Sequence, residues 1–223
     1  MRMRRKNNLE KRLSAHNEHL LFIETEDFYK KSEEERSNIL DFKKIFGNSK
    51  PLFLDVGCGK GGFALQFAGV HPEVNIIGVE KISNVIIEGA ERAARENPSN
   101  CAFLNCGAEN LSYYIPDGAV EKIFLNFSCP YPKNTYKNRR FTYKTYLKTF
   151  FRILSGEGVI ELKTDNARFF EFSIESLSEF GFKLRNITLD LHNSVYAENN
   201  IVTEYEKMFS DRGMPIFRLE ACK

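Results

Sequence analysis

A glycine-rich turn between a strand-like run and a helix-like run is the part of the sequence best suited to bind a ligand. The apolar run 51–56 leads into glycines at positions 57, 59, 61 and 62, and a helical pattern begins at Phe63. Glycine allows positive φ angles and lets a ligand approach the main chain closely. The first turn of a helix adds unpaired N–H groups and a partial positive charge. A strand, a tight turn and a helix in this order are typical of sites for nucleotide-like cofactors.

Two carboxylates indicate which cofactor this turn would hold. Asp55 lies just before Gly57 and Gly59, where its charge would repel a pyrophosphate but attract a cationic ligand. Glu80 ends the next apolar run, where an acid can bind the two hydroxyls of a ribose. S-adenosyl-L-methionine fits both positions, because it has a sulfonium, an ammonium and a ribose but no phosphate. The pattern G-x-G-x-x-G, completed by Gly62, also keeps an NAD-dependent oxidoreductase as a remote alternative, which Asp55 disfavours.

A second group of residues is suited to nucleic acid. The run Asn126–Lys133 follows a predicted strand, and two prolines, Pro130 and Pro132, stiffen it and keep it out of a helix. Cations and aromatic side chains then alternate: Tyr136, Lys137, Arg139, Arg140, Tyr143, Lys144 and Lys148. Cations neutralise phosphates, and aromatic rings stack on bases. This pattern therefore favours an RNA-binding segment over a merely solvated helix face.

Alternating strand and helix patterns must position these residues. Strands are expected at 51–56, 72–80, 101–106, 120–127 and 159–163, with helices at 82–97, 141–154 and 165–180. This alternation predicts an α/β fold with a doubly wound, mostly parallel sheet. The tail reads as a strand at 182–191, a short helix at 203–211 and a last strand at 215–220 that adds antiparallel at one side. Because parallel sheets bind ligands at the carboxyl ends of their strands, the candidate residues should gather on one rim.

The first fifty residues give weaker signals. Residues 1–12 contain six cations, which favour a basic, flexible arm over an arm that contacts phosphate. Ser32 and Glu35 form a capping-box pattern, which predicts a helix that ends at Gly47. The residues expected on its inward face are Ile39, Leu40, Ile45 and Phe46. Residues 20–31 fit no clear pattern.

Length and composition set broad limits. The chain has 223 residues, of which 42% are hydrophobic, so we expect a single domain over residues 1–223 with a sizeable core. The net charge is only +2, so any affinity for nucleic acid must come from local patches. The five cysteines are an odd number with no C-x-x-C pair, which favours reduced thiols. No run resembles a membrane span or a secretion signal, so a cytoplasmic protein without a membrane partner is expected.

The chain resembles the bacterial tRNA (guanine-N7-)-methyltransferase family almost from end to end. The matching segments are Asp55–Gly61, Phe127–Lys133 with the cations that follow it, Lys163–Asn166, Leu189–Ser194, Thr203–Glu206 and Pro215–Arg218. In the family these read acid-x-Gly-x-Gly-Lys-Gly, Phe-Ser-Asp-Pro-Trp-Pro-Lys, Lys-Thr-Asp-Asn, Leu-Asp-Leu-His-Asn-Ser, Thr-Glu-Tyr-Glu and Pro-Ile-aromatic-Arg. Many methyltransferases share the first motif, whereas the later ones are specific.

The resemblance implies a Rossmann-like class I methyltransferase that moves the methyl group of S-adenosylmethionine to N7 of a guanine in the variable loop of tRNA. By position, it implies that the cofactor site contains Asp55, Gly57, Gly59, Glu80 and Gly107. It implies that the substrate is bound by Lys133, Asp165, Thr203, Glu204, Tyr205 and Glu206. The cations Lys137, Arg139 and Arg140 are further expected tRNA contacts. Cys129 stands at the position of the family's catalytic Asp.

Two positions depart from the family in a way that bears on activity. The family has Asp where this chain has Cys129 and Gly107. Guanine N7 has a free lone pair and needs no general base, but a carboxylate at position 129 could hold the base and offset its developing positive charge. A neutral thiol is a weak hydrogen-bonding group. Other acids that could take over near the base are Asp165, Glu204 and Glu206, and Asn105 or Glu109 could partly restore the cofactor contact.

These departures leave a second hypothesis open, namely a tRNA-binding family member with weak or lost transfer activity. A methyltransferase that acts on another RNA or on a small molecule is a third hypothesis, and no residue pattern supports it. The sequence does not decide between a monomer and a homodimer.

Overall fold

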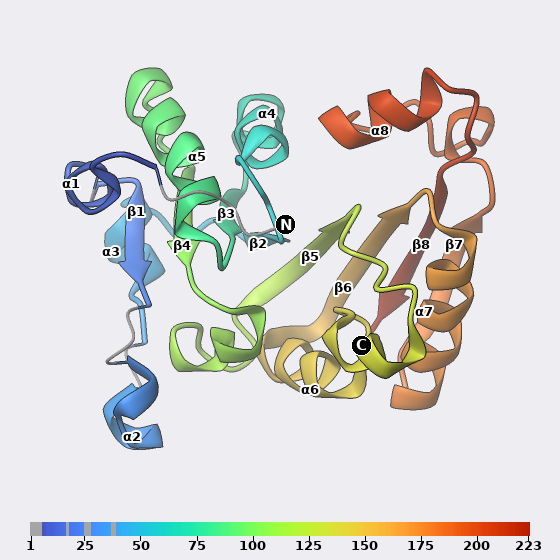
Figure 1. Ribbon diagram of the computed structural model, residues 1–223, viewed down its shortest axis with the longest axis horizontal. Helices are drawn as coiled ribbons and strands as arrows, with labels where there is room; N and C mark the ends of the chain where they lie inside the picture. The colour runs from blue at the N-terminus through green and yellow to red at the C-terminus, as the bar shows by residue number, and fades with distance from the viewer. Residues whose placement is uncertain (1–5, 17, 25–27, 37–38) are drawn as a thin grey trace. The chain divides into compact units, whose positions relative to one another are not determined.

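The computed structural model describes residues 6–16, 18–24, 28–36 and 39–223 (Figure 1). By its internal contacts the chain forms two compact units, Met1–Pro116 and Asp117–Lys223. Each unit has its own α/β organisation. The expectation of one domain over residues 1–223 stays a prediction. None of the helices in the described ranges has the length and apolar composition needed to cross a membrane.

The first unit is built on parallel strands. Its elements are β1 (Leu20–Ile23), β2 (Leu52–Val56), α4 (Gly62–Val70), β3 (Asn75–Val79), α5 (Ser83–Glu96), β4 (Cys101–Asn105) and the 3-10 helix η2 (Ala108–Tyr113). Strand β4 pairs with β1 and β3, and β3 pairs with β2, all in parallel. Every residue of β3 and β4 is buried, as expected for parallel strands covered on both faces. Strand β1 lies in the stretch that fitted no clear pattern.

Part of the basic N-terminal segment is folded onto the first unit. Helix α1 (Leu9–Ser14) contacts α5 (Figure 1). Lys6 forms an ion pair with Glu88 of α5, and Arg12 forms one with Glu91 at 2.6 Å. The expectation of a solvated arm is therefore wrong for Lys6 and Arg12, because acids of α5 bind both cations. Residues 1–5 of the predicted arm lie outside the described residues.

The helix predicted from the capping box is also different in the structure. Ser32 and Glu35 do exchange capping hydrogen bonds, but helix α2 spans only Glu33–Arg36. A separate helix α3 (Phe42–Phe46) begins after Asp41, whose carboxylate caps it, and ends at Gly47 with a φ of 66°. Ile39 is exposed, not turned inward. The local cap at Asp41 starts a new helix, which explains why one long amphipathic helix does not form.

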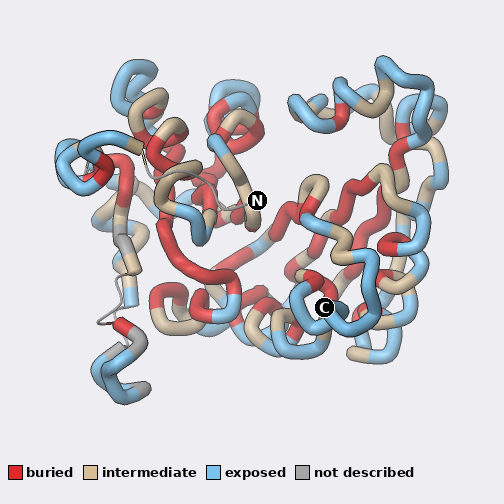
Figure 2. Tube along the Cα trace, in the orientation of Figure 1, coloured by how far each residue is buried: buried red, intermediate tan, exposed pale blue. Residues whose placement is uncertain are grey.

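The second unit contains parallel and antiparallel strands. Its elements are β5 (Val120–Asn126), η3 (Asn134–Arg139), α6 (Lys144–Ile153), β6 (Leu154–Thr164), α7 (Ala167–Phe180), β7 (Lys183–Thr188), η4 (Leu191–Asn193), α8 (Glu204–Ser210) and β8 (Phe217–Cys222). Strands β5 and β6 are parallel, whereas β8 runs antiparallel to both β6 and β7. Figure 2 shows that β5 and β6 are mainly buried and that the helices are exposed on their outer sides.

The predicted fold class is confirmed, because both units are α/β, most strand pairs are parallel and the C-terminal strand is antiparallel. One detail differs. Strand β8 was expected as an addition at one side, but it lies between β6 and β7, and β7 forms the edge. Strand β6 is also longer than predicted, since it already begins at Leu154.

Candidate functional site

The glycine turn of the first unit joins β2 to α4. The backbone N–H groups of Gly57 and Cys58 both donate to the carbonyl of Val79 on β3, at 2.8 and 3.0 Å, so the turn is fixed to the neighbouring strand end. Gly59 has a φ of 58°, and a Cβ there would meet no atom within 4 Å. At Gly61, by contrast, a Cβ would lie 2.5 Å from the ring of Phe103. Gly59 therefore borders open space, whereas Gly61 is needed for packing.

The two predicted cofactor acids lie on either side of this turn. Asp55 is buried on β2, and its Cα is paired with that of Gly78 on β3. Glu80 directly follows β3, and its Oε1 accepts the backbone N–H of Ile82 at 2.8 Å. Burial raises the pKa of Glu80, and hydrogen bonds from the backbone of Ile82, Gly59 and Lys81 oppose this rise only in part. The structure thus brings Glu80 and Gly59 together, as the sequence predicted.

Gly107 lies after β4, at the position where the family has Asp, and a neighbouring carboxylate lies beside it. The backbone N–H of Gly107 donates to Glu24 at 3.1 Å. A Cβ built at Gly107 would lie 2.7 Å from the carboxylate of Glu109. The Glu109 carboxylate, which also binds Lys81 at 2.6 Å, therefore occupies the space where a side chain at position 107 would begin. Asn105 is less available than Glu109 for the expected cofactor contact, because its side-chain amide is already bonded to Glu80 and Ser83.

In the second unit, the segment 126–133 leaves β5 with strained backbone at two aromatic residues. Phe127 and Tyr131 have φ values of 50° and 41°, a region that bulky residues rarely adopt. Arg140 braces this segment, because its guanidinium donates to the carbonyls of Pro130 and Tyr131 at 2.9 and 3.0 Å. The guanidinium also lies over the ring of Phe172, 4.4 Å from its centroid. Arg140 is buried, so the structure places it inside the loop and not among surface phosphate contacts.

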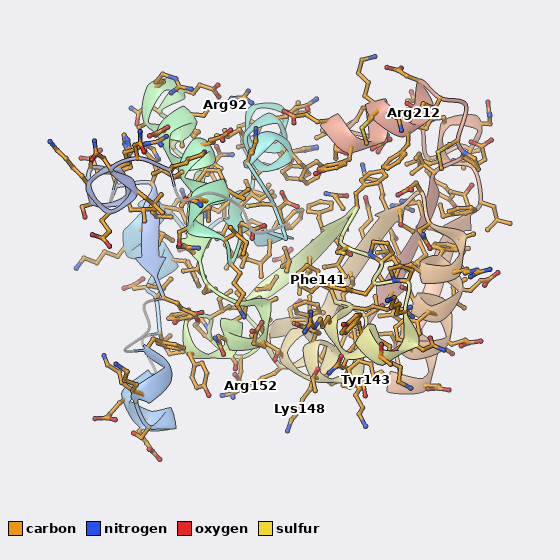
Figure 3. The ribbon with its side chains drawn as sticks, viewed as in Figure 1. Arg92, Phe141, Tyr143, Lys148, Arg152 and Arg212 are labelled. Atoms are coloured by element: carbon orange, nitrogen blue, oxygen red, sulfur yellow. The ribbon has the colours of Figure 1, made fainter. Side chains whose placement is uncertain are left out.

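The remaining predicted RNA contacts of this segment are on the surface. The exposed side chains are Cys129, Lys133, Tyr136, Lys137 and Arg139. Arg139 lies over the ring of Tyr136, 4.8 Å from its centroid, which gives a cation beside an aromatic surface. The side chain of Lys148 on α6 extends away from the ribbon (Figure 3). We call Lys133, Tyr136, Lys137 and Arg139 the cationic loop.

The segment Thr203–Glu206 divides into inner and outer residues. Thr203 caps helix α8, and Glu206 completes a capping box with it. Glu206 is fully buried and bonded to Lys163 at 2.8 Å and to His192 at 3.1 Å. The Glu206 carboxylate therefore belongs to the interior, not to the exposed face. Glu204 and Tyr205 are exposed, and Asp165 follows β6 in a partly buried position.

Sequence reasoning missed the residues that hold these segments. Lys163 lies at the end of β6 and donates to Asn200, Ile201 and Glu206, each at 2.8 or 2.9 Å. Lys163 and His192 belonged to recognised motifs, but a cation in a strand gives no sign that it will be buried. Their pairing with Glu206 depends on the tertiary fold.

Comparison with known proteins gives concordant matches. Residues 49–219 match a family model described as "Putative methyltransferase". The chain is 42% identical over 182 residues to the tRNA (guanine-N(7)-)-methyltransferase of Geobacillus kaustophilus, which covers 82% of this chain and 83% of that protein. It is 40% identical over 189 residues to that of Bacillus cytotoxicus, with 85% of each chain covered. A solved antibiotic-related methyltransferase shares the fold, with a TM-score of 0.61, 16% identity and coverage of 86% and 94%.

Proposed function

Because the chain belongs to the tRNA (guanine-N(7)-)-methyltransferase family, we propose that it transfers the methyl group of S-adenosylmethionine to N7 of a guanine in the variable loop of tRNA. The observation that carries this proposal is the identity of 42% over 82% of the chain. The comparisons do not favour the alternative of a tRNA-binding member without transfer activity.

The first unit supplies residues that suit the cofactor. Asp55 suits the cationic end of the cofactor, and Glu80 suits the ribose hydroxyls. Gly57 and Gly59 let the cofactor approach the backbone, which is supported by the open space beside Gly59. Glu109 takes the place of the missing side chain at Gly107 and supplies the carboxylate there. When bound, the cofactor provides the electrophilic methyl group.

The second unit supplies residues that suit tRNA. The cationic loop neutralises phosphates, and its Tyr136 offers a ring for stacking. Glu204 and Tyr205 are the exposed residues of their segment, so they contact the substrate, whereas Glu206 holds the segment in place. Asp165 accepts hydrogen bonds from the base. Arg140 acts by shaping the loop that carries Cys129 and Lys133.

The chemistry requires little proton transfer. The N7 lone pair forms a bond to the methyl carbon while the bond from that carbon to sulfur breaks, so the sulfonium becomes a neutral thioether and the guanine gains the positive charge. Alignment of the three atoms and exclusion of water supply much of the rate. Cys129 is exposed and makes no covalent bond in this scheme. Asp165 and Glu204 are the acids left to offset the charge on the base.

An assay of the purified protein tests this proposal. A tRNA transcript that contains guanine in its variable loop is incubated with S-adenosylmethionine, and its nucleosides are identified by mass spectrometry. We expect 7-methylguanosine to form and to be absent when that guanine is replaced by adenine. Formation of a different methylated nucleoside would contradict the proposal.

A further inference from the structure

The side chains of Asn126 and Ser128 contain buried polar atoms that no other described residue satisfies. Neither the amide nitrogen and oxygen of Asn126 nor the hydroxyl of Ser128 has a hydrogen-bond partner within the ranges that the structure describes, and all three atoms are shielded from solvent. An unsatisfied buried polar group destabilises a fold by about 1–3 kcal/mol. Such a group in a folded protein therefore needs an explanation, and a bound ligand is one.

Other buried asparagines of the chain are well bonded. The amide of Asn100 donates to three backbone carbonyls, at 3.0 to 3.1 Å. Asn105 and Asn110 also have partners for their amide nitrogens. Asn75 lacks a partner for its oxygen, but its amide nitrogen donates to Asn48 at 2.8 Å. A wholly unsatisfied asparagine side chain at position 126 is thus a local feature and not a general property of this fold.

The location of the pair points to a ligand. Asn126 is the last residue of β5, and ligands bind at the carboxyl ends of parallel strands. Between the two residues, Phe127 has a φ of 50°, and strained backbone of this kind persists where the surrounding structure fixes it. The N–H of Phe127 donates to the carbonyl of Lys163 at 2.9 Å, and the bonds of Arg140 hold the loop beyond Ser128. The backbone is thus fixed where the polar atoms are left unsatisfied.

The chemistry of the pair suits a neutral base edge. An amide presents one donor and one acceptor group side by side, and a hydroxyl can do either. The Watson–Crick edge of guanine presents the acceptor O6, the donor N1–H and the donor amine at C2. A phosphate would instead require cations, and the nearby exposed cations belong to the cationic loop.

We propose that Asn126 and Ser128 bind the Watson–Crick edge of the guanine that is methylated, an inference that rests on the proposed function. The amide of Asn126 donates to O6 and accepts from N1–H, and the hydroxyl of Ser128 accepts from the amine at C2. This arrangement leaves N7 free for the methyl group. Because N1–H becomes more acidic as N7 gains positive charge, its bond to Asn126 strengthens in the transition state.

The first test combines activity with stability in Asn126→Ala. We expect kcat/KM for tRNA to fall about tenfold to a hundredfold, as for loss of a two-bond contact to a base. The affinity for S-adenosylmethionine should not change, and the melting temperature should stay the same or rise, because no protein hydrogen bond is lost. In the matched control Asn100→Ala, the melting temperature should fall while kcat/KM of the folded protein is retained.

The second test uses Ser128→Ala with two tRNAs, which carry guanine or inosine at the accepting position. Inosine lacks only the amine at C2, so the wild type should prefer guanine, and this preference should be smaller in Ser128→Ala because one contact to the amine is lost. The inference would be overturned, while the proposed function would stand, if Asn126→Ala transferred the methyl group at the wild-type rate. Weaker binding of the cofactor by this variant would have the same meaning. An unchanged preference in Ser128→Ala would also overturn the inference. If the wild-type protein methylates no guanine in tRNA, the proposed function itself fails, and this inference fails with it.

Discussion

The Nζ of Lys163 lies 2.8 Å from Oε2 of Glu206, and both side chains are almost completely buried. Lys163 is the next-to-last residue of β6 and Glu206 lies in the first turn of α8, so one ion pair joins two residues that are 43 positions apart. His192 and Asn200 bond to the same carboxylate at 3.1 and 2.5 Å. The exposed residues Glu204 and Tyr205 are therefore held by a buried polar network.

This network predicts a stability effect. Glu206→Gln removes the charge that compensates buried Lys163, and loss of one partner of a buried pair costs about 3–5 kcal/mol of unfolding free energy. Urea unfolding measures this difference. The control Lys207→Ala removes the exposed pair with Asp211 on the same helix and should cost less than about 1 kcal/mol. Equal, small losses in both variants would show that the buried pair does not hold this segment.

The buried position of Arg140 separates it from its neighbours Lys137 and Arg139. Arg140→Lys keeps the charge, but an ammonium cannot reproduce the two carbonyl bonds and the contact with Phe172. We expect kcat/KM for tRNA to fall about tenfold or more through a misplaced loop, while the salt dependence of tRNA affinity stays unchanged. Kinetics and binding at several salt concentrations measure the two effects.

Lys137→Ala with Arg139→Ala is the matched comparison. Both side chains are exposed, so their loss should weaken tRNA binding and lower the slope of log affinity against log salt by about one for each cation removed. An unchanged slope in this double variant would assign the two cations to a solvated face. A lower slope in Arg140→Lys would contradict the role of Arg140 as a brace.

The raised pKa of Glu80 predicts how cofactor affinity depends on pH. Ribose hydroxyls bind best to the ionised carboxylate, so affinity for S-adenosylmethionine should fall as the pH is lowered, and the raised pKa places the start of this fall above the ordinary glutamate pKa of about 4.3. In the ligand-free protein, lowering the pH has the opposite effect on the contribution of Glu80 to folding stability, which increases. The contribution of Glu80 to folding stability is present below the ordinary pKa and is lost as the pH rises through the raised one.

Calorimetric titration at several pH values measures the affinity. Glu80→Gln cannot titrate, so its affinity should be lower at neutral pH and nearly constant over this range. The same pH dependence in both proteins would show that another group controls cofactor binding.

Glu109 is expected to supply the carboxylate that position 107 lacks. Glu109→Ala should weaken binding of S-adenosylmethionine about tenfold, since a hydrogen bond to a charged group is lost. Adding Gly107→Asp to this variant should restore affinity, because the space near Gly107 is then free. The control Glu96→Ala removes an exposed acid of the same unit, which pairs with Arg92, and should have no effect. Wild-type affinity in Glu109→Ala would exclude this role.

The parts of the fold that follow local periodicity were predictable. The run from β2 through α5 to β4 has strong apolar patterns and clear ends, such as Pro98 after α5, and it forms as expected. Strand β1 was not predicted, because it is four residues long and is defined by pairing with β4. Propensity alone does not identify such a strand.

The sequence offered the residue types of a candidate site, but it did not indicate which of its charged residues are buried. Arg139 and Arg140 are adjacent and identical in type, yet only Arg140 is buried, because the carbonyls of Pro130 and Tyr131 lie within its reach. The same holds for Glu204 and Glu206, of which only Glu206 faces Lys163. These distinctions come from tertiary contacts that no local pattern contains.

The most direct test of the central claim compares methyl transfer by the wild type and by Cys129→Asp. Both proteins are incubated with labelled S-adenosylmethionine and a tRNA that lacks 7-methylguanosine. We expect the wild type to label guanine N7 without a carboxylate at position 129, and Cys129→Asp to be at least as active. If only Cys129→Asp transfers the methyl group, the wild-type chain is a tRNA-binding protein without this activity, and the proposed function is contradicted.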